Sequence, residues 1–109
     1  MQPITPRDLA SWRADPGRPP PQLLDVREPW EVEICRIDGA LPIPMGAIAG
    51  GGALDALDPA QPVVCLCHHG ARSMQVALYL ESRGFEPVFN LTGGIDAWAR
   101  EVEPSLRRY

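Results

Sequence analysis

The sequence predicts an α/β fold with a central, mostly parallel sheet of about four or five strands and helices on both faces. Short and nearly continuous apolar runs at residues 23–26, 63–67 and 87–91 are typical of strands that are buried on both faces. Segments with helical patterns separate these runs along the chain. Because the 109 residues show no internal repeat, we expect one domain over residues 1–109.

The first predicted element is a short helix that begins near Pro6. Thr5 is a suitable cap residue and Pro6 suits the first helical position. Leu9 and Trp12 then face inward. Residues 14–21 are rich in proline and cannot continue a helix, so they are predicted to form a loop that leads into the first apolar run.

The remaining helices are expected between and after the apolar runs. They are predicted at 29–34, weakly near 53–57, at 71–83 and at 95–101, while 47–53 contains three consecutive glycines and is left unassigned. The helix at 71–83 has the strongest pattern. It places Val76, Leu78, Tyr79 and Leu80 against the sheet and ends at Gly84, which suits the position just past a helix.

Composition excludes several classes of function. A formal net charge of −4 gives no surface for nucleic acid or acidic membranes. No stretch approaches the roughly 20 apolar residues that span a bilayer, and the N-terminal residues do not read as a signal peptide, so we expect a cytoplasmic protein. The three cysteines favour reactive thiol chemistry over a disulfide framework.

The strongest chemical signal is the stretch VVCLCHHGARS at residues 63–73. A buried strand ends at Cys67, a short loop follows, and a helix begins near Ala71. Loop amides, Gly70 and the helix N-terminus are expected to form a nest of N–H groups around the Cys67 sulfur, and Arg72 adds a positive charge. Both features favour the thiolate, so Cys67 is predicted to be a nucleophile.

At this point the sequence resembles the rhodanese family. The loop CHHGARS at 67–73 is similar to the family's active-site loop, in which a cysteine is followed at fixed spacing by Gly, Arg and Ser. Residues 24–28 resemble its first motif, 37–40 its middle motif, and 91–94 with Ala97 and Trp98 its C-terminal motif. Taken together, the four motifs occur in the right order and cover residues 23–98.

The resemblance implies a sulfurtransferase. Cys67 would take the outer sulfur of thiosulfate, polysulfide or a related donor as a persulfide, and pass it to a thiol or, in the test tube, to cyanide. The substrate-binding residues would be His68, His69, Gly70, Ala71, Arg72 and Ser73. Asp25 would support the loop, bonded to Arg72 or to loop amides. No metal or organic cofactor is implied, because the persulfide is the reactive group.

Two features of the loop distinguish sulfur transfer from the alternative functions. Phosphatases and arsenate reductases on this fold use a loop one residue longer, whereas Cys67 and Arg72 enclose four residues, which favours sulfur transfer. A binding or regulatory module is a second hypothesis, disfavoured because silent relatives typically lack the loop cysteine. A persulfide carrier that serves an acceptor protein stays open.

The residues beside Cys67 also have simpler interpretations. His68 and His69 with Cys65 and Cys67 resemble a metal cluster, but zinc ligands usually come from two separate segments, so no metal is expected. His68 and His69 occupy positions where Arg or Lys is common in the family's enzymes that prefer thiosulfate. The preferred sulfur donor of this chain therefore stays open. Cys65 is predicted to be a core residue and Cys35 a turn residue, and a resolving role of either is the alternative.

Overall fold

A five-stranded parallel sheet forms the centre of the molecule, and the computed structural model describes all residues 1–109. The strands are β1 (Gln2–Ile4), β2 (Gln22–Asp25), β3 (Leu41–Pro42), β4 (Val63–Leu66) and β5 (Val88–Leu91). Their order across the sheet is β1-β5-β4-β2-β3, and every neighbouring pair is parallel. The cysteine-bearing strand β4 therefore lies in the middle.

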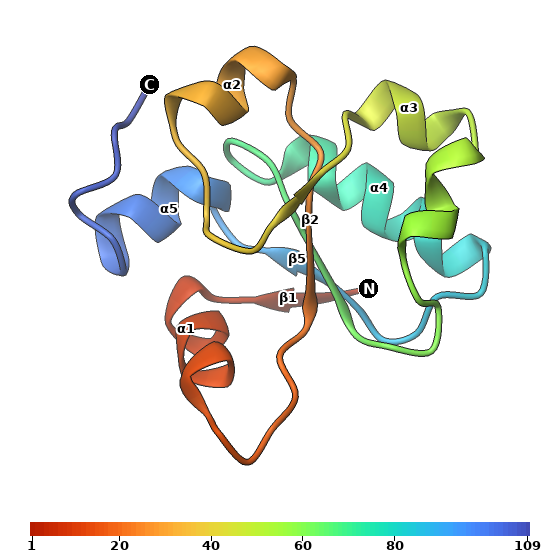
Figure 1. Ribbon diagram of the computed structural model, residues 1–109, viewed down its shortest axis with the longest axis horizontal. Helices are drawn as coiled ribbons and strands as arrows, with labels where there is room; N and C mark the ends of the chain where they lie inside the picture. Colours follow the sequence, from red (N-terminus) through yellow and green to blue (C-terminus); the bar gives the residue numbers. More distant parts are fainter.

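Helices cover both faces of this sheet (Figure 1). They are α1 (Pro6–Ala14), α2 (Pro29–Ile34), α3 (Met45–Ala49), the 3₁₀ turn η1 (Gly52–Ala56), α4 (Ala71–Ser82) and α5 (Gly94–Glu101). Helices α1 and α5 contact each other, as do α3 and α4. None of these helices combines the length and the hydrophobicity that crossing a bilayer requires.

The alternation of side chains along β4 divides the core into two clusters. Val63, Cys65 and Cys67 pack with residues of α3 and α4, whereas Val64 and Leu66 pack with residues of α1 and α5. All five are at most 1% exposed. The continuous apolar run is thus explained by helices on both faces, and the predicted fold class is confirmed.

Most predicted elements lie where the sequence placed them. The Thr5 side chain caps α1 by accepting a hydrogen bond from the Asp8 amide, and Leu9 and Trp12 are buried. Gly84 follows α4 with a φ of 89°. The weak helix expected near 53–57 is only the 3₁₀ turn η1.

One residue of the predicted apolar face is placed wrongly. Leu78 is 52% exposed, while Val76 and Leu80 are buried and Tyr79 is partly buried. Ser73, Val76, Ala77 and Leu80 make the buried stripe of α4, with the spacing of three and four residues that one helix face requires. Leu78 lies outside that spacing and points to solvent.

The parallel arrangement determines where a site can form. The carboxyl ends of β2, β4 and β5 lie at one edge of the sheet, so the segments that follow them at residues 26–28, 67–70 and 92–93 come together there. The predicted loop after β4 is the central one of the three.

Candidate active site

Cys67 lies at the end of β4 with its sulfur surrounded by hydrogen-bond donors. The Gly70 amide lies 3.1 Å from Sγ, the Ser73 amide 3.4 Å and the Ser73 hydroxyl 3.3 Å. Cys67 itself is 1% exposed. Hydrogen-bond donors directed at a sulfur that is buried from solvent stabilise a negative charge on it. A thiolate or a persulfide carries such a charge.

Gly70 is required by the shape of this loop. It precedes α4 with a φ of 119°, in the region that L side chains rarely adopt. Only with this turn does the Gly70 amide point back at Cys67 while α4 begins at Ala71. The predicted nest of loop amides at the helix N-terminus is therefore present.

The N-terminus of α5 supports the same loop from behind. The Ile95 amide donates to the Cys67 carbonyl at 2.9 Å, and the Asp96 amide donates to the His68 carbonyl at 3.1 Å. Gly94 allows this approach, because a Cβ atom there would lie 2.5 Å from the Cys67 carbonyl oxygen. The turn at Gly93 and Gly94 thus brings backbone against the active-site loop.

Arg72 forms an ion pair that the sequence did not predict. Its Nη1 and Nη2 atoms donate to the two carboxylate oxygens of Glu31 at 2.6 and 2.8 Å. Glu31 is on α2 and only 3% exposed, and a hydrogen bond from the Tyr109 hydroxyl at 2.7 Å adds to its partners. The hydrogen bonds from Arg72 are the main cause that lowers the pKa of Glu31 to about 2.

The partner expected for Asp25 is wrong. Asp25 accepts from Arg27, with 2.7 Å between Arg27 Nη2 and Asp25 Oδ2, and not from Arg72 or a loop amide. Arg27 is fully buried and also donates to the Cys35 carbonyl at 2.8 Å. Burial alone would lower the Arg27 pKa, but hydrogen bonds to Asp25 and Tyr109 raise it. Asp25 thus anchors the segment that carries Glu31.

The side chains of the loop residues His68 and His69 form an aromatic stack with Tyr109. The His68 ring stacks on the Tyr109 ring at 3.9 Å with an angle of 9°, and the His69 ring lies 3.9 Å from His68. Burial is the largest cause that lowers the pKa of His68, with the neighbouring His69 next. The lowered pKa favours the neutral form of the His68 ring.

The other two cysteines are buried and free. Cys65 is fully buried in the same core cluster as Cys67, and burial raises the pKa of its thiol to about 12. A thiol that holds its proton so strongly packs well but is a poor nucleophile. Cys35 is 8% exposed, with Arg27 Nη1 3.9 Å from its sulfur.

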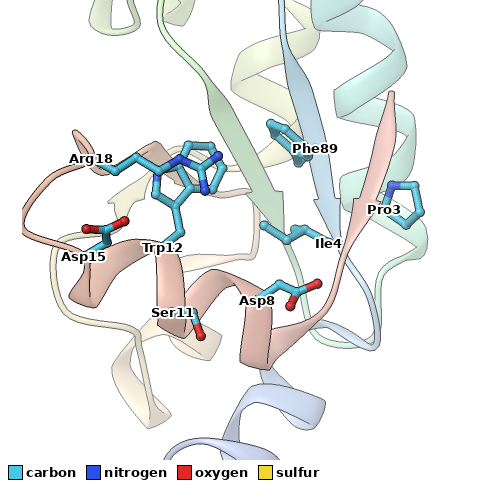
Figure 2. Close-up of a pocket in the computed structure, with 8 residues that line it drawn as sticks. All are labelled: Pro3, Ile4, Asp8, Ser11, Trp12, Asp15, Arg18 and Phe89. Carbon is cyan, nitrogen blue, oxygen red and sulfur yellow. The ribbon is translucent and has the colours of Figure 1, made fainter.

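One hollow of the surface adjoins the active-site loop, and another lies at α1. A hollow of about 690 Å³ adjoins the loop at His69, Gly70 and Ala71. A second hollow of about 400 Å³ lies at α1 and the end of β1, where the Arg18 guanidinium stacks 4.0 Å above the Trp12 ring (Figure 2). No residue of the 67–73 loop lines the second hollow. Cys67 and Arg72 line neither of the two.

The fold and the loop define an α/β protein with a cysteine held in an anion-stabilising turn between a central strand and a helix. The sequence model of the rhodanese-like domain matches residues 5–101. The chain belongs to the rhodanese-like domain family.

Relatives and solved structures agree with this assignment. The chain is 45% identical over 91 residues to the rhodanese-like/PpiC domain-containing protein 12, chloroplastic, of Arabidopsis thaliana, a match that covers 81% of this chain and 30% of that protein. It is 40% identical over 82 residues to a sulfurtransferase of Allochromatium vinosum, with 75% of each covered. A rhodanese-like domain protein of Staphylococcus aureus superposes with a TM-score of 0.82 at 31% identity, covering 94% of this chain and 95% of that one.

Glu31 gives a stability prediction. The lowered pKa means that the folded protein keeps this carboxylate charged as the pH falls from 4.5 to about 2, whereas the unfolded chain takes up the proton near 4.5. The pair therefore stabilises the fold above pH 4.5, and this contribution is lost towards pH 2. Glu31→Gln should lower the free energy of unfolding at neutral pH and make its decline in acid shallower, as measured by urea unfolding across this range.

A matched control is Glu33→Gln, on the exposed side of the same helix, which should leave the curve unchanged. Parallel curves for the parent and Glu31→Gln would contradict a stabilising role of the Arg72 pair.

Proposed function

We propose that this chain is a sulfurtransferase in which Cys67 carries the transferred sulfur as a persulfide. The observation that carries the proposal is the set of three donors directed at the Cys67 sulfur, two from amides and one from the Ser73 hydroxyl. Further support comes from the similarity to the Allochromatium vinosum sulfurtransferase, which extends over 75% of each protein.

The proposed reaction has two steps. The Cys67 thiolate attacks the outer sulfur of thiosulfate, the sulfur–sulfur bond of the donor breaks, and sulfite leaves with the bonding electron pair. Cys67 then holds an anionic persulfide. In the second step an acceptor thiolate, or cyanide in the test tube, attacks the outer sulfur, and the Cys67 thiolate is the leaving group.

The same donors serve both steps. Negative charge lies on the cysteine sulfur before the attack and on the outer sulfur afterwards, so a compact nest of N–H groups lowers the energy of each species. Four residues separate Cys67 from Arg72, the shorter loop that the resemblance associates with sulfur transfer rather than with a tetrahedral oxyanion. The donor could equally be a polysulfide, and the acceptor a protein thiol.

Turnover of thiosulfate and cyanide into thiocyanate tests this proposal. We expect activity in the parent protein and none in Cys67→Ala. A polysulfide donor with a small thiol acceptor is the second assay. Absence of turnover in both assays would overturn the proposal and favour a binding module.

Arg72→Ala should impair anionic donors selectively. Hydrogen bonds to charged groups contribute about 1.5–3 kcal/mol, so kcat/KM for thiosulfate should fall about tenfold or more, while a sulfur donor without a charge should be affected less. Because the single variant leaves Glu31 buried without its partner, the double variant Glu31→Gln with Arg72→Ala is the fold-preserving version. Equal kinetics with thiosulfate in the parent and in both variants would contradict a role of Arg72 in binding.

A further inference from the structure

Asn90 is hydrogen-bonded to both residues that supply the donors to Cys67, whereas no hydrogen bond joins it to Cys67 itself. It lies on β5 and is 6% exposed. Its Oδ1 atom lies 2.5 Å from the Ser73 hydroxyl, and its Nδ2 atom donates to the Gly70 carbonyl at 3.1 Å. The two amides and one hydroxyl directed at the Cys67 sulfur all belong to Gly70 and Ser73.

The Ser73 hydroxyl has a single proton and three acceptors within reach. These are Asn90 Oδ1 at 2.5 Å, the Gly70 carbonyl at 3.2 Å and the Cys67 sulfur at 3.3 Å. The proton can serve only one of them at a time. Asn90 Oδ1 is the nearest of the three, so Asn90 holds the hydroxyl in place.

The contacts of Asn90 fix both residues that supply amides to the Cys67 sulfur. The Ser73 hydroxyl donates to Oδ1, and the Ser73 and Gly70 amides then lie 3.4 and 3.1 Å from the sulfur. The bond from Nδ2 to the Gly70 carbonyl keeps the Asn90 amide in one orientation, because a flipped amide would place two oxygens against each other.

We propose that Asn90 is a positioning residue that sets the ionisation of Cys67 by holding the Ser73 hydroxyl and the Gly70 peptide. Through its Oδ1 atom it holds Ser73, whose amide lies 3.4 Å from the sulfur. Through Gly70 it fixes the peptide whose amide lies 3.1 Å from the sulfur. The inference deepens the proposed sulfurtransferase function, but ionisation can be measured without any sulfur donor.

The test is the pH dependence of Cys67 alkylation by iodoacetamide. The modified cysteine is located by fragmentation of the peptide, because Cys65 lies two residues away in the same tryptic peptide. In Asn90→Ala the midpoint of the profile should rise by about one pH unit, since one pH unit corresponds to about 1.4 kcal/mol, the size of one hydrogen bond. Alkylation at neutral pH should then be several-fold slower. An unchanged midpoint would overturn the proposal.

Two further variants separate positioning from a general loss of packing. Val88→Ala opens a cavity in the same strand, at a residue 2% exposed, and should lower stability without moving the midpoint. In a Ser73→Ala background, Asn90→Ala should shift the midpoint by clearly less than in the parent. A shift of equal size in both backgrounds would overturn the role of Ser73. Because the assay uses no sulfur donor, its outcome is independent of whether the chain transfers sulfur.

Discussion

Cys67→Ser is expected to reduce sulfur transfer by about 10³-fold or more while leaving the fold intact. The serine hydroxyl fits the same space and can accept hydrogen bonds from the Gly70 and Ser73 amides, so packing is preserved. A hydroxyl is not ionised near neutral pH and does not form a stable persulfide, so the first step of the proposed reaction is lost. Initial rates of thiocyanate formation and the melting temperature measure the two effects.

Cys35→Ser is the matched control for this variant. Cys35 is also buried, but its sulfur lies beside Arg27 and accepts no hydrogen bond from the loop amides. We expect Cys35→Ser to keep most of the parent activity. Appreciable residual sulfur transfer by a folded Cys67→Ser variant would contradict the assignment of Cys67 as the nucleophile.

Gly94→Ala is expected to damage both activity and stability. A Cβ atom at this position would lie 2.4 Å from the His68 carbonyl oxygen and 2.5 Å from that of Cys67, and the φ of 62° is unfavourable for alanine. The contacts are backbone, so the active-site loop itself must move. We expect the free energy of unfolding to fall by about 2–4 kcal/mol and transfer to fall about 100-fold, because the donors would no longer align on the sulfur.

Gly46→Ala provides the comparison for Gly94→Ala. Gly46 is in α3, has no positive φ, and a Cβ atom there would meet nothing within 4 Å. Alanine at this position should leave stability unchanged or slightly increased, since it favours the helix over glycine. If urea unfolding and transfer rates showed the two variants to be alike, the close approach of α5 to the loop would have no functional consequence.

The parts of the fold that were predicted correctly depend on local signals. The run at 63–67 is apolar at every position because β4 is central and covered on both faces, and this needs no knowledge of partners. Strands β1 and β3 have three and two residues, contain proline and are mostly exposed. Their pairing with β5 and β2 makes them strands, so the sequence alone offered no pattern for them.

The active site also combines contacts that are local in the sequence with contacts that are distant in it. Cys67, Gly70 and Ser73 are neighbours in sequence, so the spacing of one loop was enough to predict that they lie together. Glu31 lies 41 positions from Arg72, and Asn90 lies 17 positions from Ser73. Such contacts are created by the order of the strands. The capping box that Glu31 forms with Glu28 was the one local signal of its position.

The contacts of Tyr109 and Asp25 could not be predicted from the sequence either. Tyr109 reaches Glu31 across 78 positions, and nothing in the C-terminal residues indicated that its ring would stack on His68. Asp25 was expected near the loop, and its strand does end there, but Arg27 lies two residues away and takes both of its oxygens. Competition between two possible arginine partners is decided by geometry rather than by sequence spacing.

Intact mass after incubation with thiosulfate, with and without later thiol treatment, tests the central claim most directly. The persulfide mechanism predicts a gain of about 32 Da, one sulfur atom, that is absent in Cys67→Ala and disappears when a thiol is added. No gain with either thiosulfate or polysulfide, or a gain that persists in Cys67→Ala, would contradict it.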